Sequence, residues 1–418
     1  MIKQRSMCKL AIIFSTFLML TGCWDQEEID QRAYVLGIGL DKGEAEGEVE
    51  LTYLISNPEV GSTQQGGGTE EPSHEIITFD AGSLIHSQDI ANAVIAKPIT
   101  YDILDLIVVS EELARSKNFI RWVYDATKDR EVRRDTKLIV TKEKASKFLV
   151  KNKPKQETRR HEYFEIMLEN ANSIGLIPNS ELHNFFRVTE ADADLFITAY
   201  ATAEHDEHMA DKNIDSELLA GKLKVKGNTN PTQFLGSAVF KEGVMIGTLS
   251  VEETRLSKMV NTISEKPSFL TSFPDPFMEE YAITVRFTQL KSSNVKVNVT
   301  KKSPEINVNL PLQVEVLTDH SMVNYAKDKE KREKLKKHIE ERGKEAFLKL
   351  VKKTQEEFKG QPFGFSLAAR KHFLTIEQWE NYDWMNSYPN SEVDINIDIQ
   401  FGEFGRQSEL PNLQKVRD

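Results

Sequence analysis

The sequence predicts an α+β protein of more than one domain, in which mixed β-sheets are covered by packed helices. Strand-like and helix-like segments alternate between residues 74 and 172. Three later segments alternate apolar and polar residues with the period of a strand. The chain has 418 residues, and at about 100 to 200 residues per domain it has room for two or three domains.

The composition is that of an ordinary folded chain with an acidic balance. Hydrophobic residues make up 39%, charged residues make up 28%, and the formal net charge is −11. These values exclude a collagen-like chain, a polytopic membrane protein and a disulfide-built scaffold. The two cysteines are Cys8 and Cys23, so the rest of the chain has no thiol for nucleophilic catalysis or metal ligation.

The first 22 residues have the pattern of a signal peptide. Lys3, Arg5 and Lys9 form a basic segment without an acidic residue, and an apolar run follows at residues 10–20. That run is too short to span a bilayer, since a transmembrane helix needs about 20 apolar residues. We therefore expect residues 1–22 to be a cleaved lipoprotein signal peptide.

The end of this segment matches the cleavage box of bacterial lipoproteins, the lipobox. Leu20, Thr21 and Gly22 precede Cys23 in the order that the box requires. A chance cysteine after an ordinary signal peptide is the alternative, and four matching positions argue against it. We expect Cys23 to carry a diacylglycerol and an N-acyl lipid, because two or more acyl chains give a stable anchor whereas one chain is marginal. The acidic body would be repelled by anionic lipid, so attachment depends on Cys23.

The N-terminal domain, residues 23–204, is predicted to contain a hairpin followed by alternating strands and helices. A loop rich in glycine and proline separates the hairpin from the later elements at residues 56–73. Ser110 precedes two glutamates and is expected to cap a helix. The expected strands are 33–40, 49–55, 75–79, 103–109 and 137–140, and the expected helices are 83–96, 111–124, 142–150 and 161–172.

A polar linker at residues 205–231 leads to the C-terminal domain, residues 232–405, which could divide near residue 318, and a tail covers residues 406–418. Three successive segments between residues 281 and 317 are expected to be antiparallel strands with one solvated face. The expected strands are 233–240, 244–249, 281–290, 294–301, 305–317 and 393–399, and the expected helices are 251–263, 325–359 and 376–381.

The helix expected from Tyr325 to Lys359 is rich in basic residues and is interrupted by Gly343. One interpretation is a basic ridge lying on lipid headgroups or on an acidic partner loop. The other is a solvated face with ion pairs four residues apart, such as Glu330 with Lys334. The mixed signs along the segment favour the solvated face.

The nearest approach to a metal site is the pair His205 and His208, three residues apart and flanked by Glu204, Asp206 and Glu207. Histidines at this spacing share a helix face and could bind zinc. The segment lacks the His-Glu-x-x-His order and an evident third ligand, so we expect no metal or cofactor site.

No catalytic residues are expected, because the chain lacks a Gly-x-Ser-x-Gly nucleophile elbow. Asp192 and Asp194 could in principle work as an acid and a base, but aspartates two residues apart more often mark a turn or a helix boundary. Trp379, Tyr382 and Trp384 are expected to form a structural cluster, with a contact patch as the alternative.

Several segments, in order, resemble the Ger(x)C family of germination lipoproteins. The first is the most specific, because it joins the lipobox to a strand signature. Gln361, Pro362 and Ser366 depart from the acidic residue and glycine common in the family around this turn. The resembling segments are Cys23–Ile29 (CWDQEEI), Val35–Asp41 (VLGIGLD), Ser110–Ala114, Arg130–Arg133, Gly236–Lys241, Ile246–Gly247, Glu253–Thr254, Phe363–Phe365, Trp379, Trp384 and Phe401–Gly402.

The resemblance implies a non-enzymatic C-type subunit of a spore nutrient germinant receptor. Such a subunit would be held by Cys23 on the extracytoplasmic face of the inner spore membrane. Its partners would be a polytopic A-type subunit and a membrane-embedded B-type subunit, with no nucleic acid and no direct small-molecule ligand expected. Two alternatives are a solute-binding lipoprotein that captures the nutrient and an envelope hydrolase.

Overall fold

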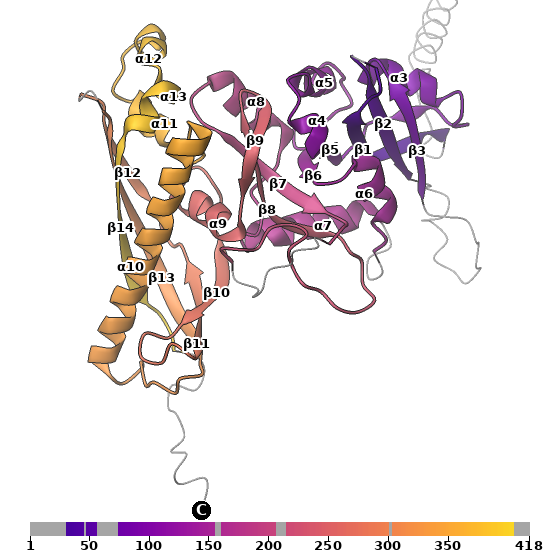
Figure 1. The fold of residues 1–418 in the computed structure, drawn as a ribbon. Helices are drawn as coiled ribbons and strands as arrows, with labels where there is room; N and C mark the ends of the chain where they lie inside the picture. The colour runs from indigo at the N-terminus through magenta and orange to yellow at the C-terminus, as the bar shows by residue number, and fades with distance from the viewer. Residues whose placement is uncertain are drawn as a thin grey trace, which may run out of the picture.

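A computed structural model describes residues 31–45, 47–56, 74–154, 160–205, 215–300 and 303–404. The predicted lipobox, Leu20 to Cys23, and the predicted tail lie outside these ranges. Within them the chain forms two β-sheets with helices packed on both, which confirms the α+β fold class (Figure 1). None of the helices in these ranges is long and apolar enough to cross a membrane.

The first half of the chain alternates strands and helices, as the sequence predicts. Its elements are β1 (Ala33–Lys42), β2 (Val49–Ser56), β3 (His74–Ala81), α3 (Leu84–Ala91), β4 (Ile99–Thr100), β5 (Leu106–Ser110), α4 (Glu111–Ala114), α5 (Phe119–Ala126), β6 (Lys137–Thr141), α6 (Ala145–Lys151), α7 (Arg160–Ser173), α8 (Leu182–Ala191) and β7 (Phe196–Thr202). The α8 helix and the β7 strand were not predicted.

The second half supplies two further strands to the first sheet and then builds the second. Its elements are β8 (Gln233–Lys241), β9 (Val244–Leu249), α9 (Val251–Val260), β10 (Ser268–Pro274), β11 (Ala282–Thr288), β12 (Asn294–Asn298), β13 (Glu305–Asp319), α10 (Lys329–Lys353) with a π-helical turn (Thr354–Phe358), α11 (Phe365–Arg370), α12 (Ile376–Tyr382), α13 (Trp384–Ser387), a 3₁₀ turn (Tyr388–Asn390) and β14 (Glu392–Phe401). The β10 strand was not predicted.

The first sheet is mixed and has the order β3-β2-β1-β5-β6-β7-β8-β9, with β4 beside β1. β1 and β2 form the predicted antiparallel hairpin, whereas β1, β5, β6 and β7 run parallel. β8 pairs antiparallel with β7. This sheet therefore continues across the boundary predicted at residues 205–231, and the described part of that segment, residues 205 and 215–231, has no helix or strand.

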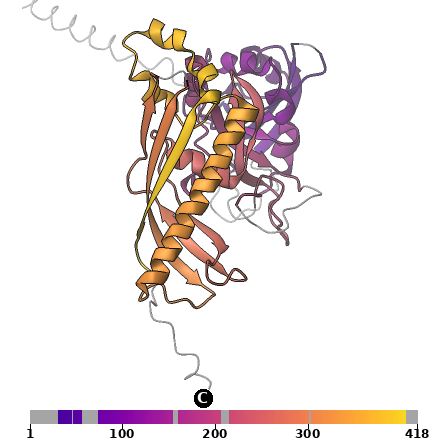
Figure 2. The same ribbon diagram turned by 60° about the vertical axis from the view of Figure 1, so that its left-hand side comes forward.

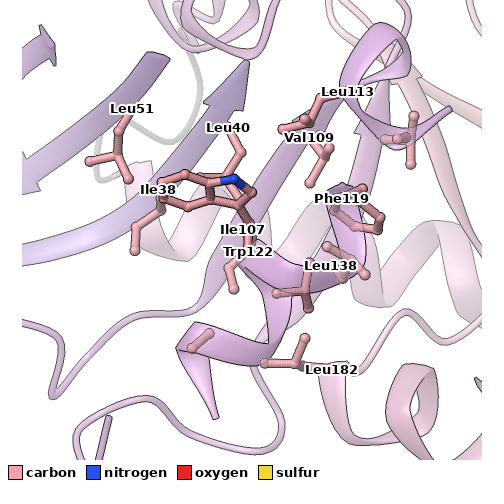
Figure 3. Close-up of a cluster of buried hydrophobic side chains, with 14 of the residues drawn as sticks. Ile38, Leu40, Leu51, Ile107, Val109, Leu113, Phe119, Trp122, Leu138 and Leu182 are labelled. Atoms are coloured by element: carbon pink, nitrogen blue, oxygen red, sulfur yellow. The ribbon is translucent and has the colours of Figure 1, made fainter. Parts of the chain in front are cut away.

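Helices cover both faces of the first sheet because successive residues of its central strands point to opposite sides. On one face, Ile107 and Val109 of β5 pack with α3, α4, α5 and α8; Phe119 and Trp122 of α5 lie over the strands in Figure 3. On the other face, β5 packs with α6 and α7. Both faces are buried, which is typical of parallel strands.

Asp41 and Gly39, both in the segment that resembles the germination family, position α6. The buried Asp41 carboxylate accepts hydrogen bonds from the backbone N–H groups of Ala145 (2.7 Å) and Ser146 (2.9 Å), at the first turn of the helix. A Cβ at Gly39 would lie 3.1 Å from Leu149, so glycine lets α6 approach the strand. Asp41 therefore fixes the start of α6, and Gly39 allows the helix to pack closely on β1.

The helix predicted at residues 111–124 is two short helices, α4 and α5. Ser116 accepts the N–H of Asn118 on its hydroxyl and the N–H of Phe119 on its carbonyl, which replaces the helical pattern with a turn. Ser110 lies at the predicted N-cap position, with Glu111 and Glu112 in the first turn of α4. Its hydroxyl makes no capping hydrogen bond and instead donates to the Leu40 carbonyl at 3.4 Å.

The second sheet has the order β10-β11-β13-β12, and β14 pairs with β13. β11 and β12 each pair antiparallel with β13, so all three are antiparallel strands as predicted. β14 runs parallel to β13 along ten residue pairs, from Glu305 with Glu392 to Val314 with Phe401. The long β13 strand is therefore the centre of this sheet.

The α10 helix lies along the second sheet and contacts β14 (Figure 2). It is continuous through Gly343, contrary to the predicted interruption. A Cβ at this position would lie 2.7 Å from Cδ1 of Ile397, so the glycine allows close packing of helix on strand. On the solvated side, Lys336 and Lys337 pair with Glu340 and Glu341, while Lys334 lies over the Phe277 ring instead of a glutamate.

Candidate functional site

The candidate site is the junction between the two sheets, where α9 lies between them (Figure 1). Ser250 and Glu253 form a capping box at the start of α9. The Glu253 N–H donates to the Ser250 hydroxyl, and the Ser250 N–H donates to the Glu253 carboxylate. Buried residues continue from Thr254 to Val260, and they include two cations, Arg255 and Lys258. Buried charged groups of this kind need defined partners.

Lys258 joins α9 to the segment after α7. Its ammonium donates to the carbonyl oxygens of Asn172 (2.5 Å) and Ile177 (3.2 Å) and to the side-chain oxygen of Asn172. Burial lowers the pKa of Lys258 to about 8, and Glu265 opposes the shift. The three donors of the ammonium are therefore all used, which suits a structural cation and leaves no free amine for catalysis.

Arg255 makes the matching connection one turn earlier on α9. It pairs with Asp215 and donates to the carbonyl of Ile174 at 3.3 Å, and its guanidinium lies 4.4 Å from the centre of the Phe269 ring. Burial lowers its pKa, although the Asp215 charge opposes this. Since Ile174 follows α7 and Phe269 belongs to β10, one side chain contacts both sides of the junction.

Glu253 also connects α9 with α10. Its carboxylate accepts hydrogen bonds from the ammonium of Lys353 at 2.9 and 3.0 Å, and the same ammonium donates to the Thr248 carbonyl. The acid that caps α9 thus pairs with a cation in the last turn of α10. A single half-buried cluster therefore fixes α9 relative to α10 and to β9.

A second contact joins the loop before β7 to the turn after α10. The Asp194 carboxylate accepts hydrogen bonds from the Ser366 hydroxyl (2.6 Å) and from the Gln361 side-chain amide. The Gln361 carbonyl accepts the N–H of Leu195 at 2.9 Å, and its side-chain oxygen accepts that of Phe363 at 2.7 Å. Burial raises the pKa of Asp194 to about 6, against the lowering effect of Ser366.

This second contact gives a role to the residues that depart from the family pattern. Gln361 is fully buried and Ser366 is 5% exposed. Both donate hydrogen bonds to Asp194, whose sequence context indicated only a candidate acid or base or a turn residue. Asp192 is exposed, ends α8 in a left-handed conformation and takes no part in the contact. The two aspartates therefore occupy different environments.

A cleft of about 140 Å³ lies beside the junction, between α8 and α9. Its lining is rich in amides and also has charges of both signs. The polar residues around it are Asn172, Asn179, Asn184, Arg187, Ser257, Lys258, Asn261, Ser264 and Glu265. Such a lining suits a polar contact with a peptide segment or solvent better than it suits an apolar ligand.

The histidine segment lies elsewhere, at the end of β7. Glu204 accepts hydrogen bonds from Lys147 and Lys151, which lower its pKa, and His205 lies 3.2 Å from the Gln233 amide. His208 lies outside the described ranges, as do Asp206 and Glu207. Within those ranges no group of three histidine, cysteine or acidic residues is placed to hold a metal ion.

The three aromatic residues near the C-terminus form a packed cluster. Trp379 and Trp384 are 9% and 2% exposed, and their rings stack with centroids 6.2 Å apart. Tyr382 stacks on Trp384 at 6.5 Å, and Phe373 packs on Tyr382 at 5.0 Å. The cluster thus supports the short helices α12 and α13.

Comparisons with known proteins give consistent results for both halves of the chain. The model "Spore germination protein N-terminal domain" matches residues 25–201, and "Spore germination B3/ GerAC like, C-terminal" matches residues 235–405. The crystal structure of the GerBC protein has the same fold, with a TM-score of 0.51, 16% identity and coverage of 91% of this chain and 99% of that one.

Among Bacillus subtilis (strain 168) proteins, the chain is similar to spore germination protein B3, with 26% identity over 37% of this chain and 40% of that protein. It is also similar to spore germination protein A3, with 34% identity over 25% of this chain and 27% of that protein. The similarity thus spans less than half the length of these two relatives.

Proposed function

The chain belongs to the Ger(x)C family of spore germination proteins, and from this we propose that it is a lipid-anchored, non-enzymatic subunit of a nutrient germinant receptor. The observation that supports this best is the order of the parts: a lipobox at Leu20 to Cys23, followed by the two germination domains. In this arrangement an acylated Cys23 holds a folded body on the extracytoplasmic face of the inner spore membrane.

The proposed role of the anchor is to confine the body near its partners. Attachment to one membrane raises the effective concentration of the other subunits, so a modest interface is enough for assembly. The partners we propose are a polytopic A-type and a membrane-embedded B-type subunit. The junction supports a rigid adaptor, because Arg255, Lys258 and Asp194 lock the two sheets together.

The absence of a reactive arrangement at the junction supports a non-enzymatic role. Lys258 has all three donors engaged, and the enclosed Asp194 carboxylate is bound by two donors. Catalysis would need a nucleophile and a base held together beside open space. We expect the purified mature chain to leave peptidoglycan and ester substrates unchanged; their turnover would support an envelope hydrolase instead.

The subunit role is tested by capture of the full chain from detergent-solubilised spore membranes. We expect a large polytopic protein and a second membrane protein to be recovered with it, and spores lacking the chain to lose their response to one set of nutrients. A matched control uses the chain's own Met1 to Ile29 segment, with the lipobox, fused to an unrelated reporter domain. Recovery of the chain alone, with a normal nutrient response in its absence, would contradict the proposal.

A solute-binding lipoprotein is the second candidate, and one cavity favours it. It has a volume of about 90 Å³, lies between α9, α10 and the second sheet, and has apolar walls with Glu252 and Arg342 among its polar lining residues. Burial raises the pKa of Glu252. A nutrient bound there should raise the melting temperature of the purified chain. The receptor-subunit proposal predicts no shift with nutrients that trigger the spores.

A further inference from the structure

The turn between α11 and α12 exposes apolar side chains to an unusual degree. Leu374 is 95% exposed, the highest value for a large apolar side chain in the described ranges, and Ile376 is 63% exposed. Leu367 on the neighbouring α11 is 38% exposed. Exposed apolar residues scattered singly need no explanation, but two that share one turn mark a candidate contact surface.

The turn is held in place by hydrogen bonds and ring contacts. The Leu374 N–H donates to the Gln378 side-chain oxygen at 3.0 Å, and the Gln378 N–H donates to the Thr375 hydroxyl at 3.2 Å. Beneath the turn, the Phe373 ring packs on Trp379 with centroids 5.5 Å apart. The aromatic cluster therefore supports a fixed turn that points apolar side chains outward.

Charge is distributed unevenly around this apolar tip. Arg370 and Lys371, both exposed, come directly before it, whereas the exposed Glu377 and Glu380 follow in α12. Cationic side chains next to exposed leucine and isoleucine match the depth profile of a phospholipid surface, where phosphates lie above the acyl chains.

The position of the turn agrees with the position of the expected anchor. α12 and α3 lie at the same end of the molecule, opposite the end at which α10 begins (Figures 1 and 2). β1 begins beside β4, which contacts α3, and Arg32 pairs with Asp102 there at 3.2 Å. Eight peptide units separate Cys23 from Gln31, and they span at most about 28 Å.

We propose that residues 373–376 form a second contact with the phospholipid bilayer, in which Leu374 and Ile376 enter the headgroup region while Arg370 and Lys371 meet lipid phosphates. The inference rests on the proposed anchoring at Cys23. With the anchor and the turn on one surface, the body takes a defined orientation on the membrane. The far end, where α10 begins, then points away from the lipid.

The experiment uses an environment-sensitive fluorophore on a single introduced cysteine. With Cys23→Ser the mature chain has no other thiol, so Leu374→Cys labels one site. An N-terminal histidine tag in place of the lipid attaches the protein to vesicles of phosphatidylcholine, phosphatidylglycerol and a nickel-chelating lipid. We use NBD as the fluorophore, and we expect its emission to shift to shorter wavelength and to rise several-fold when the protein attaches to the vesicles. The matched control, Glu330→Cys in the first turn of α10, should show no change.

Unchanged emission from the Leu374 site on attached protein would overturn the proposal. Cross-linking of this site to another receptor subunit in spore membranes, without a vesicle response, would assign the turn to a protein partner and would also overturn it. Leu374 is fully exposed, so the variant should fold, and its melting temperature checks this. Because the tag supplies attachment, the result does not depend on whether Cys23 is acylated.

Discussion

Replacing Asp194 with asparagine tests whether the second junction contact contains a carboxylate that is costly to ionise. In the folded chain this carboxylate is enclosed and accepts hydrogen bonds from Ser366 and Gln361. An asparagine can keep both contacts, because its oxygen can accept from the Gln361 amide and its NH₂ group can donate to the Ser366 hydroxyl. The substitution therefore removes the negative charge with little change in shape.

The size of the effect follows from the pKa of Asp194, which burial raises from 3.8 to about 6. At about 1.4 kcal/mol per pKa unit, ionisation of Asp194 in the folded chain lowers the free energy of unfolding by about 3 kcal/mol. The folded state binds the proton more tightly than the unfolded state, so stability falls as the pH rises between these two pKa values. The change of stability with pH therefore has the opposite sign to that expected for a carboxylate in an ion pair, whose pKa is lowered in the folded state.

We therefore expect the free energy of unfolding of Asp194→Asn, relative to the wild type, to increase with pH. The gain should grow by about 2 kcal/mol between about pH 4.5 and about pH 7.5, because most of the ionisation of the folded carboxyl falls in this interval. Urea denaturation of both proteins at the two pH values, followed by tryptophan fluorescence, measures the difference.

Asp192→Asn is the matched control, since Asp192 is exposed and lies only two residues away. Its effect should stay within about 0.5 kcal/mol at both pH values. A destabilisation by Asp194→Asn that is equal at both pH values would refute the reasoning. It would show that the carboxylate is ionised without cost and serves as a fixed hydrogen-bond acceptor.

Three further substitutions test other parts of the structure. Lys258→Met should lower the free energy of unfolding by about 2 kcal/mol in urea denaturation, because buried carbonyl oxygens lose their donor; Lys266→Met, on the exposed surface, is the control. Gly236→Ala should cost about 3 kcal/mol or prevent folding, since φ is +80° and a Cβ would lie 2.4 Å from the Leu249 oxygen. Asp41→Ala should cost about 2 kcal/mol and speed hydrogen exchange in α6, whose first two N–H groups it binds.

Each of these three has an outcome that would contradict it. For Lys258→Met, stability equal to that of the control would mean that its carbonyl partners are solvated instead. For Gly236→Ala, an unchanged melting temperature would show that the strand accepts a side chain at this position. For Asp41→Ala, exchange that speeds equally in all helices would indicate global destabilisation without a specific role in capping α6.

The strands with strong patterns were predictable from the sequence, and those with weak patterns were not. β1, β2 and β8 are rich in apolar and β-branched residues between turn residues, so their existence followed from local chemistry. β10 was missed because its sequence, SFLTSFP, ends in proline and contains two serines. The parallel pairing of β14 with β13 joins segments about 90 residues apart, and no local pattern encodes such a pairing.

The junction was predictable only in part. The helix at residues 251–263 was predicted, whereas its capping by Glu253 and the pairing of Glu253 with Lys353 are known only from the structure. The contact of Asp194 with Gln361 joins residues 167 positions apart, so it could not be derived from spacing. The departure from the family pattern at Gln361 was the one sequence feature that pointed to this contact. Only the structure identifies Asp194 as its partner.

The most direct test of the central claim is the location of the Cys23→Ala chain in spores, measured by immunoblotting of membrane and soluble fractions. Cys8→Ala is the matched control, because Cys8 lies within the signal peptide. We expect the Cys8→Ala chain to stay in the inner-membrane fraction, whereas the Cys23→Ala chain should leave it and the nutrient response should be lost. Full membrane retention of the Cys23→Ala chain with a normal response would contradict the claim.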